Sequence, residues 1–397
     1  MRNLTVGLAR PLVRLLGRDE RGGVAVLVAV LISGGVLLGI GALVIDVGQI
    51  YQNRAELQSG AEAGALAVAR ACAAGACPAG ASQYTLATQY ASANASALTG
   101  HDANVTLVCG RDANAVLTSC TTGTTTSSSD LIDCPPSPSA GNYVDVHSAT
   151  QTPTGTVLPP VFARSLLGAS GYSGTRVAAC AQVQWGTAEQ SNSLAFTISL
   201  CAWQGLVGPD TDGDAASSVD ADGDSDDNGA FNTPIAVYIK GKAKACAGPG
   251  GQNVPGGFGW LASTPGTCTA TINLNTNTTY TDPGNNVTAA CKAAVAADVA
   301  SFVAGNPVTV FVPVFDSTSG TGSNAAYHVT GLAGFVIMGN HKLPGMADGG
   351  TWTACLTSDP SASNAPCLEG YFKPGLDPVG PIGSGNNFGA NAVQITG

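Results

Sequence analysis

The residues best suited to bind an ion lie between positions 210 and 229, in the segment DTDGDAASSVDADGDSDDNG. The pattern Asp-x-Asp-Gly-Asp occurs there twice, ten residues apart, and the segment contains no basic residue. Carboxylates that alternate along a tight, glycine-containing turn point at a common centre, and calcium takes about six to eight oxygen ligands. The candidate calcium ligands are Asp210, Asp212, Asp214, Asp220, Asp222, Asp224, Asp226 and Asn228.

The spacing of this acidic segment resembles the calcium loops of dockerins and of thrombospondin type 3 repeats. It departs from an EF-hand, because a loop that starts at Asp224 has Ile235 at its twelfth position instead of a bidentate glutamate. A solvated acidic insertion without an ion is the alternative. Mutual repulsion among close carboxylates favours a cation, so we expect calcium as the cofactor.

Cysteines are the second chemically distinctive set, and all twelve lie beyond residue 71. An even number of cysteines indicates disulfides if this part of the chain is exported, as the charge-free run described below predicts. Spacing alone predicts only the short-range pairs Cys72–Cys77 and Cys355–Cys367. Zinc would need Cys-x-x-Cys pairs or Cys/His clusters, whereas the four histidines are scattered. We therefore expect disulfides, with at least eight of the twelve cysteines paired.

No catalytic constellation stands out. The sequence lacks Gly-x-Ser-x-Gly, His-Glu-x-x-His and a phosphate-binding Gly-x4-Gly-Lys-Ser/Thr motif. Asp316, His328 and several serines could be assembled into a hydrolase triad, but their order and spacing do not favour it. We predict a protein that is not an enzyme.

The chain is organised around Gly22 to Ile45, a run of 24 residues without a charge. As one helix it would extend roughly 36 Å, enough to cross a hydrocarbon layer of roughly 30 Å. Five arginines against Asp19 and Glu20 give residues 1–21 a charge of +3, so the positive-inside rule keeps that arm in the cytoplasm. The sequence thus predicts a single-pass protein of the cell membrane, with its C-terminal part outside.

A cleavable signal peptide is the competing interpretation of the same run. Signal peptides have an apolar region of roughly 7 to 15 residues and a nearby small-x-small site, whereas this run is longer and leads directly into Asp46. We therefore expect the run to be retained and to contact the lipid bilayer.

Residues 46–75 contain no proline, are rich in alanine and predict a stalk helix that continues outward. One face of it, which we call the seam, alternates three and four residues apart. A sheet of the same chain or a helix of another subunit could cover this face. The seam consists of Val47, Ile50, Arg54, Leu57, Ala61, Gly64, Val68 and Ala71.

Five stretches follow one another between about residues 18 and 72: DERGG, the apolar run, IDVGQIY, RAELQ and AEAGALA. In this order they resemble the Flp pilus-assembly TadE/TadG-like family. The resemblance implies a bitopic envelope protein of a tight-adherence or type IVb pilus system, acting as a minor pilin or accessory assembly factor. It also implies protein partners in that assembly, met through the stalk helix. A membrane-tethered surface binding or adhesion module is the alternative function.

The remaining residues predict an α+β protein. We expect a small α+β domain over 76–188, a β-rich disulfide-containing domain over 189–372 that carries the acidic segment, and a loosely held tail over 373–397. With 11 basic and 24 acidic residues, the part of the chain after residue 21 carries a charge of −13. That charge argues against nucleic acid as a partner.

Overall fold

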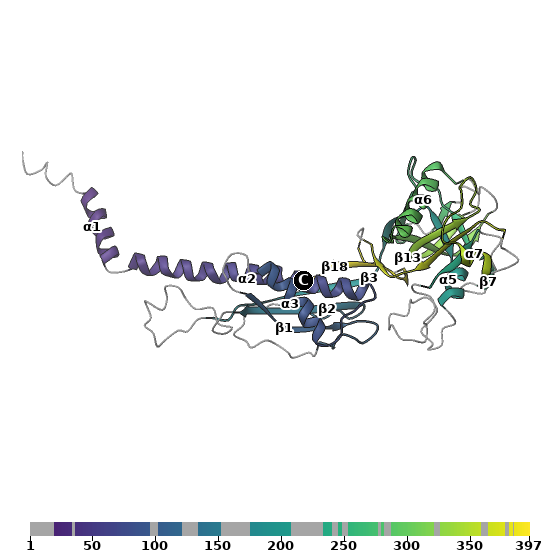
Figure 1. Cartoon of the computed structure of the whole chain (residues 1–397). Helices are drawn as coiled ribbons and strands as arrows, with labels where there is room; N and C mark the ends of the chain where they lie inside the picture. Colours follow the sequence, from purple (N-terminus) through teal and green to yellow (C-terminus); the bar gives the residue numbers. More distant parts are fainter. Residues whose placement is uncertain are drawn as a thin grey trace, which may run out of the picture.

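The longest element of the computed structural model is helix α2 (Val36–Ala73), which follows helix α1 (Glu20–Ser33) (Figure 1). The sequence predicted a single helix over 22–45, whereas the structure has two helices in this region. Residues 34–35 between them lie outside the described residues. Both are glycines, the poorest helix formers after proline. In the part of the chain that the structure describes, no helix is both long enough and apolar enough to cross a membrane.

The structure is mixed α/β, and its two large sheets, of five and nine strands, each have their own core. It describes residues 20–33, 36–95, 102–120, 134–151, 175–207, 233–239, 245–247, 253–276, 279–281, 287–320, 326–358, 364–377, 381–383 and 385–397.

The unit next to the long helix, which we call the proximal unit, combines α2 and α3 (Ala81–Ala95) with a five-stranded sheet in the order β1-β2-β3-β18-β16. Alternating apolar residues explain why β2 and β3 bury one face against α2, where Val144, Val146 and Val183 are fully buried. The strands are β1 (Asp102–Arg111), β2 (Asn142–Gln151), β3 (Ala178–Thr187), β16 (Gly375–Leu376) and β18 (Ala390–Ile395).

The C-terminal segment differs from the sequence prediction. Residues 373–397 were expected to be loosely held, yet β18 lies inside the proximal sheet, antiparallel to β3 and parallel to β16. Ala390 and Ala392 of β18 are buried, and together with Phe388 they belong to the core of the other unit. The segment is held by pairing with strands that lie far from it in sequence, which local periodicity cannot reveal.

The distal unit consists of the elements between β3 and β18 apart from β16, built around a nine-stranded sheet with β13 at its centre. Residues 326–341 form this one long strand, which is buried on both faces from Gly331 onward. The helices are α5 (Leu200–Val207), α6 (Ala289–Val303) and α7 (Thr353–Thr357). The strands are β4 (Gln190–Leu194), β5 (Phe196–Ser199), β6 (Ile235–Tyr238), β7 (Cys246–Ala247), β8 (Asn253–Val254), β9 (Phe258–Trp260), β10 (Thr269–Asn273), β11 (Thr279–Thr281), β12 (Thr309–Ser319), β13 (Ala326–His341), β14 (Gly349–Gly350), β15 (Cys367–Phe372) and β17 (Asn386–Phe388).

All twelve cysteines are paired in six disulfides, which confirms the expectation of extensive pairing and both predicted local bridges. No bridge joins the two units, so the disulfides cross-link each unit separately. The proximal bridges are Cys72–Cys77, Cys109–Cys120 and Cys134–Cys180; the distal bridges are Cys201–Cys246, Cys268–Cys291 and Cys355–Cys367.

Candidate functional site

Helix α2 changes character along its length. In its C-terminal half the seam packs on the chain's own sheet, and Leu57, Ala61 and Val68 are buried in the proximal core. Two buried hydroxyl groups of β2 fix its register: Ser148 Oγ donates to the Leu57 carbonyl at 3.0 Å and Thr150 Oγ1 donates to Asn53 Oδ1 at 2.7 Å. The sequence left two possibilities for what covers the seam, a sheet of the same chain or a helix of another subunit. In the C-terminal half of α2 the chain's own sheet covers it.

The close packing of α2 on α3 depends on Gly64. A Cβ atom at this position would lie 2.9 Å from the Ala87 carbonyl oxygen, a backbone atom that cannot move aside cheaply. Gly64 therefore lets α3 lie directly on the stalk helix, and the two helices form one rigid layer over the sheet.

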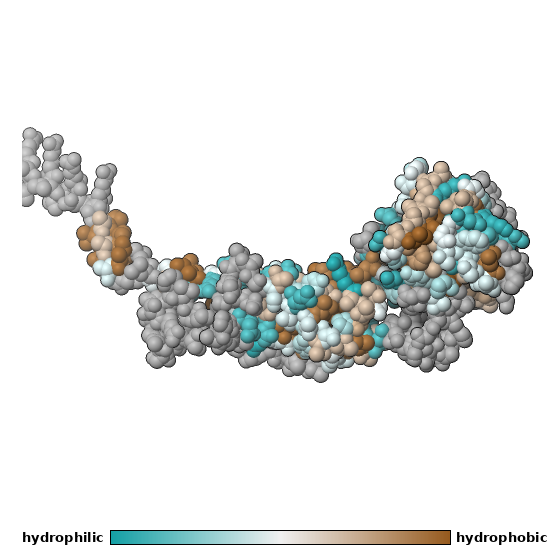
Figure 2. Space-filling model, in the orientation of Figure 1, coloured by the Kyte–Doolittle hydropathy of each residue, from teal (hydrophilic) through white to brown (hydrophobic). Residues whose placement is uncertain are grey.

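The N-terminal half of α2 has the opposite environment. Ile40, Leu43 and Val44 are more than half exposed, and Tyr51 is 70% exposed. Together with the exposed valines and leucine of α1, they form an apolar surface that extends beyond the proximal unit (Figures 1 and 2). An apolar helical surface of this extent is typical of a segment that meets lipid or another protein.

The predicted calcium ligands Asp210 to Asn228 all fall in residues 208–232, outside the described residues. Calcium binding by this segment therefore stays a prediction.

Two titratable residues of β2 lie on the sheet face opposite α2, each beside a disulfide. Asp145 Oδ2 is 3.4 Å from Cys120 Sγ, and His147 Nε2 is 3.8 Å from Cys134 Sγ. Burial raises the pKa of Asp145 to about 6, although Gln182 beside it acts in the opposite direction, and burial lowers the pKa of His147. Cys109, Cys120 and Asp145 lie close enough together to hold a metal, but the disulfide between the two cysteines removes both thiolates as ligands.

A histidine–aspartate pair is present at the residues that a hydrolase triad would require. His328 Nδ1 lies 2.7 Å from Asp316 Oδ1, and Ser317 Oγ donates to that same carboxylate oxygen at 3.0 Å. In a catalytic triad the serine would instead bond to the far imidazole nitrogen. The geometry is that of a hydrogen-bonded strand end.

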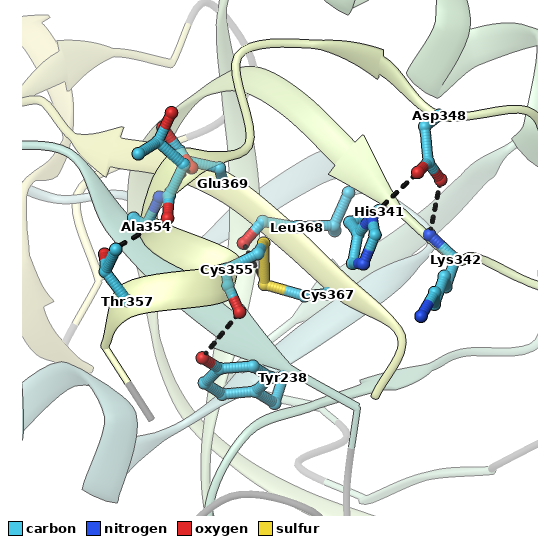
Figure 3. Close-up of a disulfide and its surroundings, with 11 residues drawn as sticks. Tyr238, His341, Lys342, Asp348, Ala354, Cys355, Thr357, Cys367, Leu368 and Glu369 are labelled. Carbon is cyan, nitrogen blue, oxygen red and sulfur yellow. Dashed lines mark hydrogen bonds and ion pairs between the residues drawn. A yellow bond between two sulfur atoms is a disulfide. The ribbon is translucent and has the colours of Figure 1, made fainter. Parts of the chain in front are cut away.

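The loop after β13 forms a rigid wall next to α6. Asp348 accepts hydrogen bonds from the Lys342 backbone N–H and from His341 Nδ1, both at 2.7 Å (Figure 3). The His341 ring also stacks on Trp352. The Lys342 N–H bond is the main reason that the pKa of Asp348 is lowered.

Helix α7 is tied to the same region. Glu369 accepts from the Ala354 N–H at 2.6 Å, Tyr238 O–H donates to the Cys355 carbonyl, and the Cys355–Cys367 bridge joins α7 to β15 (Figure 3). Burial raises the pKa of Glu369. Only the cysteine spacing of this cluster is visible in the sequence, because Tyr238 lies 117 residues before Cys355.

Comparison with known proteins adds one match. Residues 22–71 match the model of the Flp pilus-assembly TadE/G-like family, at the N-terminal region. No curated protein and no solved structure matches the chain. The match covers α1 from Gly22 and nearly all of α2, and so confirms the predicted resemblance. The N-terminal region of this chain is therefore similar to the TadE/G-like proteins of Flp pilus assembly.

Proposed function

We propose that the protein is a membrane-anchored, extracytoplasmic component of a tight-adherence (Flp/type IVb) pilus system, acting as a minor pilin or accessory assembly factor. The family match over residues 22–71 is the observation that carries the proposal. It coincides with the charge-free run and with the exposed apolar side chains of α1 and of the first half of α2. The proposed role is structural and not enzymatic.

In this proposal residues 22–45 cross the bilayer once and the arginine-rich arm stays in the cytoplasm. The support is the distribution of charge: five arginines precede the run, and Asp46 is the first charged residue after it. Six disulfides after this point fit an oxidising compartment outside the cytoplasm.

Cysteine labelling tests the topology. Ala9→Cys and Ala74→Cys each add one thiol to a chain whose native cysteines are all paired. On intact cells an impermeant maleimide should label Ala74→Cys alone, and both variants should react after permeabilisation. Labelling of Ala9→Cys on intact cells, or a mature protein that starts beyond Asp46, would exclude this topology.

Deletion of the gene tests the assembly role. Loss of surface pili, restored by the wild-type chain, is the expected result. Changing the exposed Tyr51 to Ser should reduce co-purification of pilus components while leaving the melting temperature unchanged; Arg70→Ser, at another exposed position of the same helix, is the matched control. Normal piliation without the chain would favour a tethered surface-binding module instead.

We also propose that the segment containing Asp210 to Asn228 binds calcium. A ligand that binds only the folded state stabilises it by about 2.7 kcal/mol at one hundred times the dissociation constant. Extracellular calcium modules bind at roughly 0.1 to 1 mM, so the melting temperature should rise up to about 10 mM calcium, and less with magnesium. Asp→Asn at positions 212 and 222 should abolish the rise; an unchanged wild-type melting curve would leave a solvated acidic insertion.

A further inference from the structure

A groove of about 560 Å³ lies on the distal unit between α6 and the loop of residues 345–350; we call it the α6 groove. Its walls are mostly apolar, and Ala296, Val299, Ala300 and Val303 of α6 line it together with Met346. Figure 2 shows apolar surface at the side of the distal unit where Figure 1 places α6.

The α6 groove is built before any partner arrives. Asn340 Nδ2 donates to the Ala347 carbonyl at 2.8 Å, and Asp348 is fixed by His341 and the Lys342 N–H. Gly350, at φ +66°, forms a floor of the groove that has no side chain; a Cβ atom there would lie 2.7 Å from Val299 Cγ1. A fixed wall and a side-chain-free floor reduce the ordering cost of binding.

One charge in the α6 groove is unbalanced. Lys292 lines the groove, and its ammonium group has no hydrogen-bond or ion-pair partner among the described residues. The groove's other charged residue, Asp348, is already compensated by its two donors. The groove therefore offers an apolar surface with one free positive charge, which a carboxylate beside an aliphatic group would complement.

We propose that the α6 groove binds an extended segment of a partner protein, which places an aliphatic side chain on the alanines of α6 and an Asp or Glu carboxylate at Lys292. A polypeptide fits better than a small ligand because Ala293, Ala296 and Ala300 are exposed, leaving the groove open. Small-molecule sites enclose about 70–90% of their ligand. The proposal rests on the distal unit alone and is independent of membrane anchoring and of pilus assembly.

An array of synthetic heptapeptides that combine Leu, Ser, Glu and Lys at every position tests the proposal, probed with the full-length chain. Peptides that pair Leu with Glu should be enriched, with affinities at least tenfold above their Lys counterparts. Ala296→Arg fills the groove and should abolish the enrichment. The matched control, Ala297→Arg, changes an exposed alanine of the same helix outside the groove and should preserve it.

Lys292→Glu should reverse the charge preference, so that Leu–Lys peptides replace Leu–Glu peptides. Melting temperatures identify variants that fold, and either Ala296→Arg or Lys292→Glu suffices for the test. Equal peptide binding by wild type and Ala296→Arg, or an acidic preference that survives Lys292→Glu, overturns the proposal. Binding of decanoate without any peptide, lost in Ala296→Arg, also overturns it and identifies a lipid site.

Discussion

The side-chain amide of Asn391 donates a hydrogen bond to the backbone carbonyl of Ala73, with 2.8 Å between the two atoms. Ala73 is the last residue of α2, and Asn391 lies on β18, near the other end of the chain. The last carbonyls of a helix have no partner within the helix. The C-terminal strand therefore supplies the donor for the carbonyl of the last residue of α2.

Asn391→Ala should lower the free energy of unfolding by about 1–3 kcal/mol, because it leaves a buried carbonyl without a donor. Chemical denaturation of the full-length chain measures this change. Gln394→Ala, an exposed change on the same strand, is the control and should stay within about 0.5 kcal/mol of wild type. Equal losses for both variants would show that the bond contributes nothing.

Ala61→Asp should destabilise the proximal unit by about 3–5 kcal/mol, because Ala61 is fully buried and the new carboxylate has no partner. Arg70→Ala, on the exposed side of the same helix, should leave stability nearly unchanged. The melting temperatures of wild type, Ala61→Asp and Arg70→Ala measure the difference. An unaltered Ala61→Asp melting curve would contradict the packing of α2 on the sheet.

Replacing Cys355 and Cys367 together by Ser should cost about 2–4 kcal/mol of unfolding free energy. The loss should be local, since Tyr238 and Glu369 still hold α7 in place. Mass spectrometry after alkylation without reductant should find no free thiol in the wild type or in the double variant. The single variant Cys355→Ser should show one free thiol. Free thiols in the unreduced wild type would contradict the six bridges.

Asp145 should make folding pH-dependent. Its pKa in the folded chain, about 6, lies above the ordinary value of 3.8, so the folded state binds more protons between these values. Stability from this group is complete below about pH 4 and is lost as the pH rises through 6. A shift of this size corresponds to about 3 kcal/mol at most.

Asp145→Asn should remove that loss and raise stability at pH 7.5 relative to pH 4.5, as measured by urea unfolding at both values. His147 has a lowered pKa, so its contribution runs in the opposite direction: it is present above about pH 6.5 and is lost on acidification. His147→Gln therefore serves as a control of opposite sign. Identical pH profiles for wild type and Asp145→Asn would show that Asp145 is solvated.

Regular local patterns made much of the fold predictable. The seam of α2 identified Leu57 and Ala61 as packed residues, and both are buried. Local alternation does not indicate β13 as one strand, because Gly331 and Gly334 interrupt it and both faces of the strand are buried there.

The features that depend on distant pairing were not predictable. Nothing local in residues 386–395 indicates that β18 pairs with β3, since its partner lies about 200 residues earlier. The burial of Asp145 has the same origin, because its carboxylate lies 3.4 Å from the sulfur of Cys120, which is 25 residues earlier in the chain. The α6 groove likewise depends on a loop and a helix that meet only in the folded chain.

The position of β18 between β3 and β16 has a consequence for the order of synthesis. Residues 188–389, which include the whole distal unit, lie in the chain between two neighbouring strands of the proximal sheet. A ribosome therefore completes every strand of the distal sheet before the proximal sheet can close. Until then the open edge of β3 is available to other strands, so a chaperone or an early partner would act at this edge before the C-terminal strand has been made.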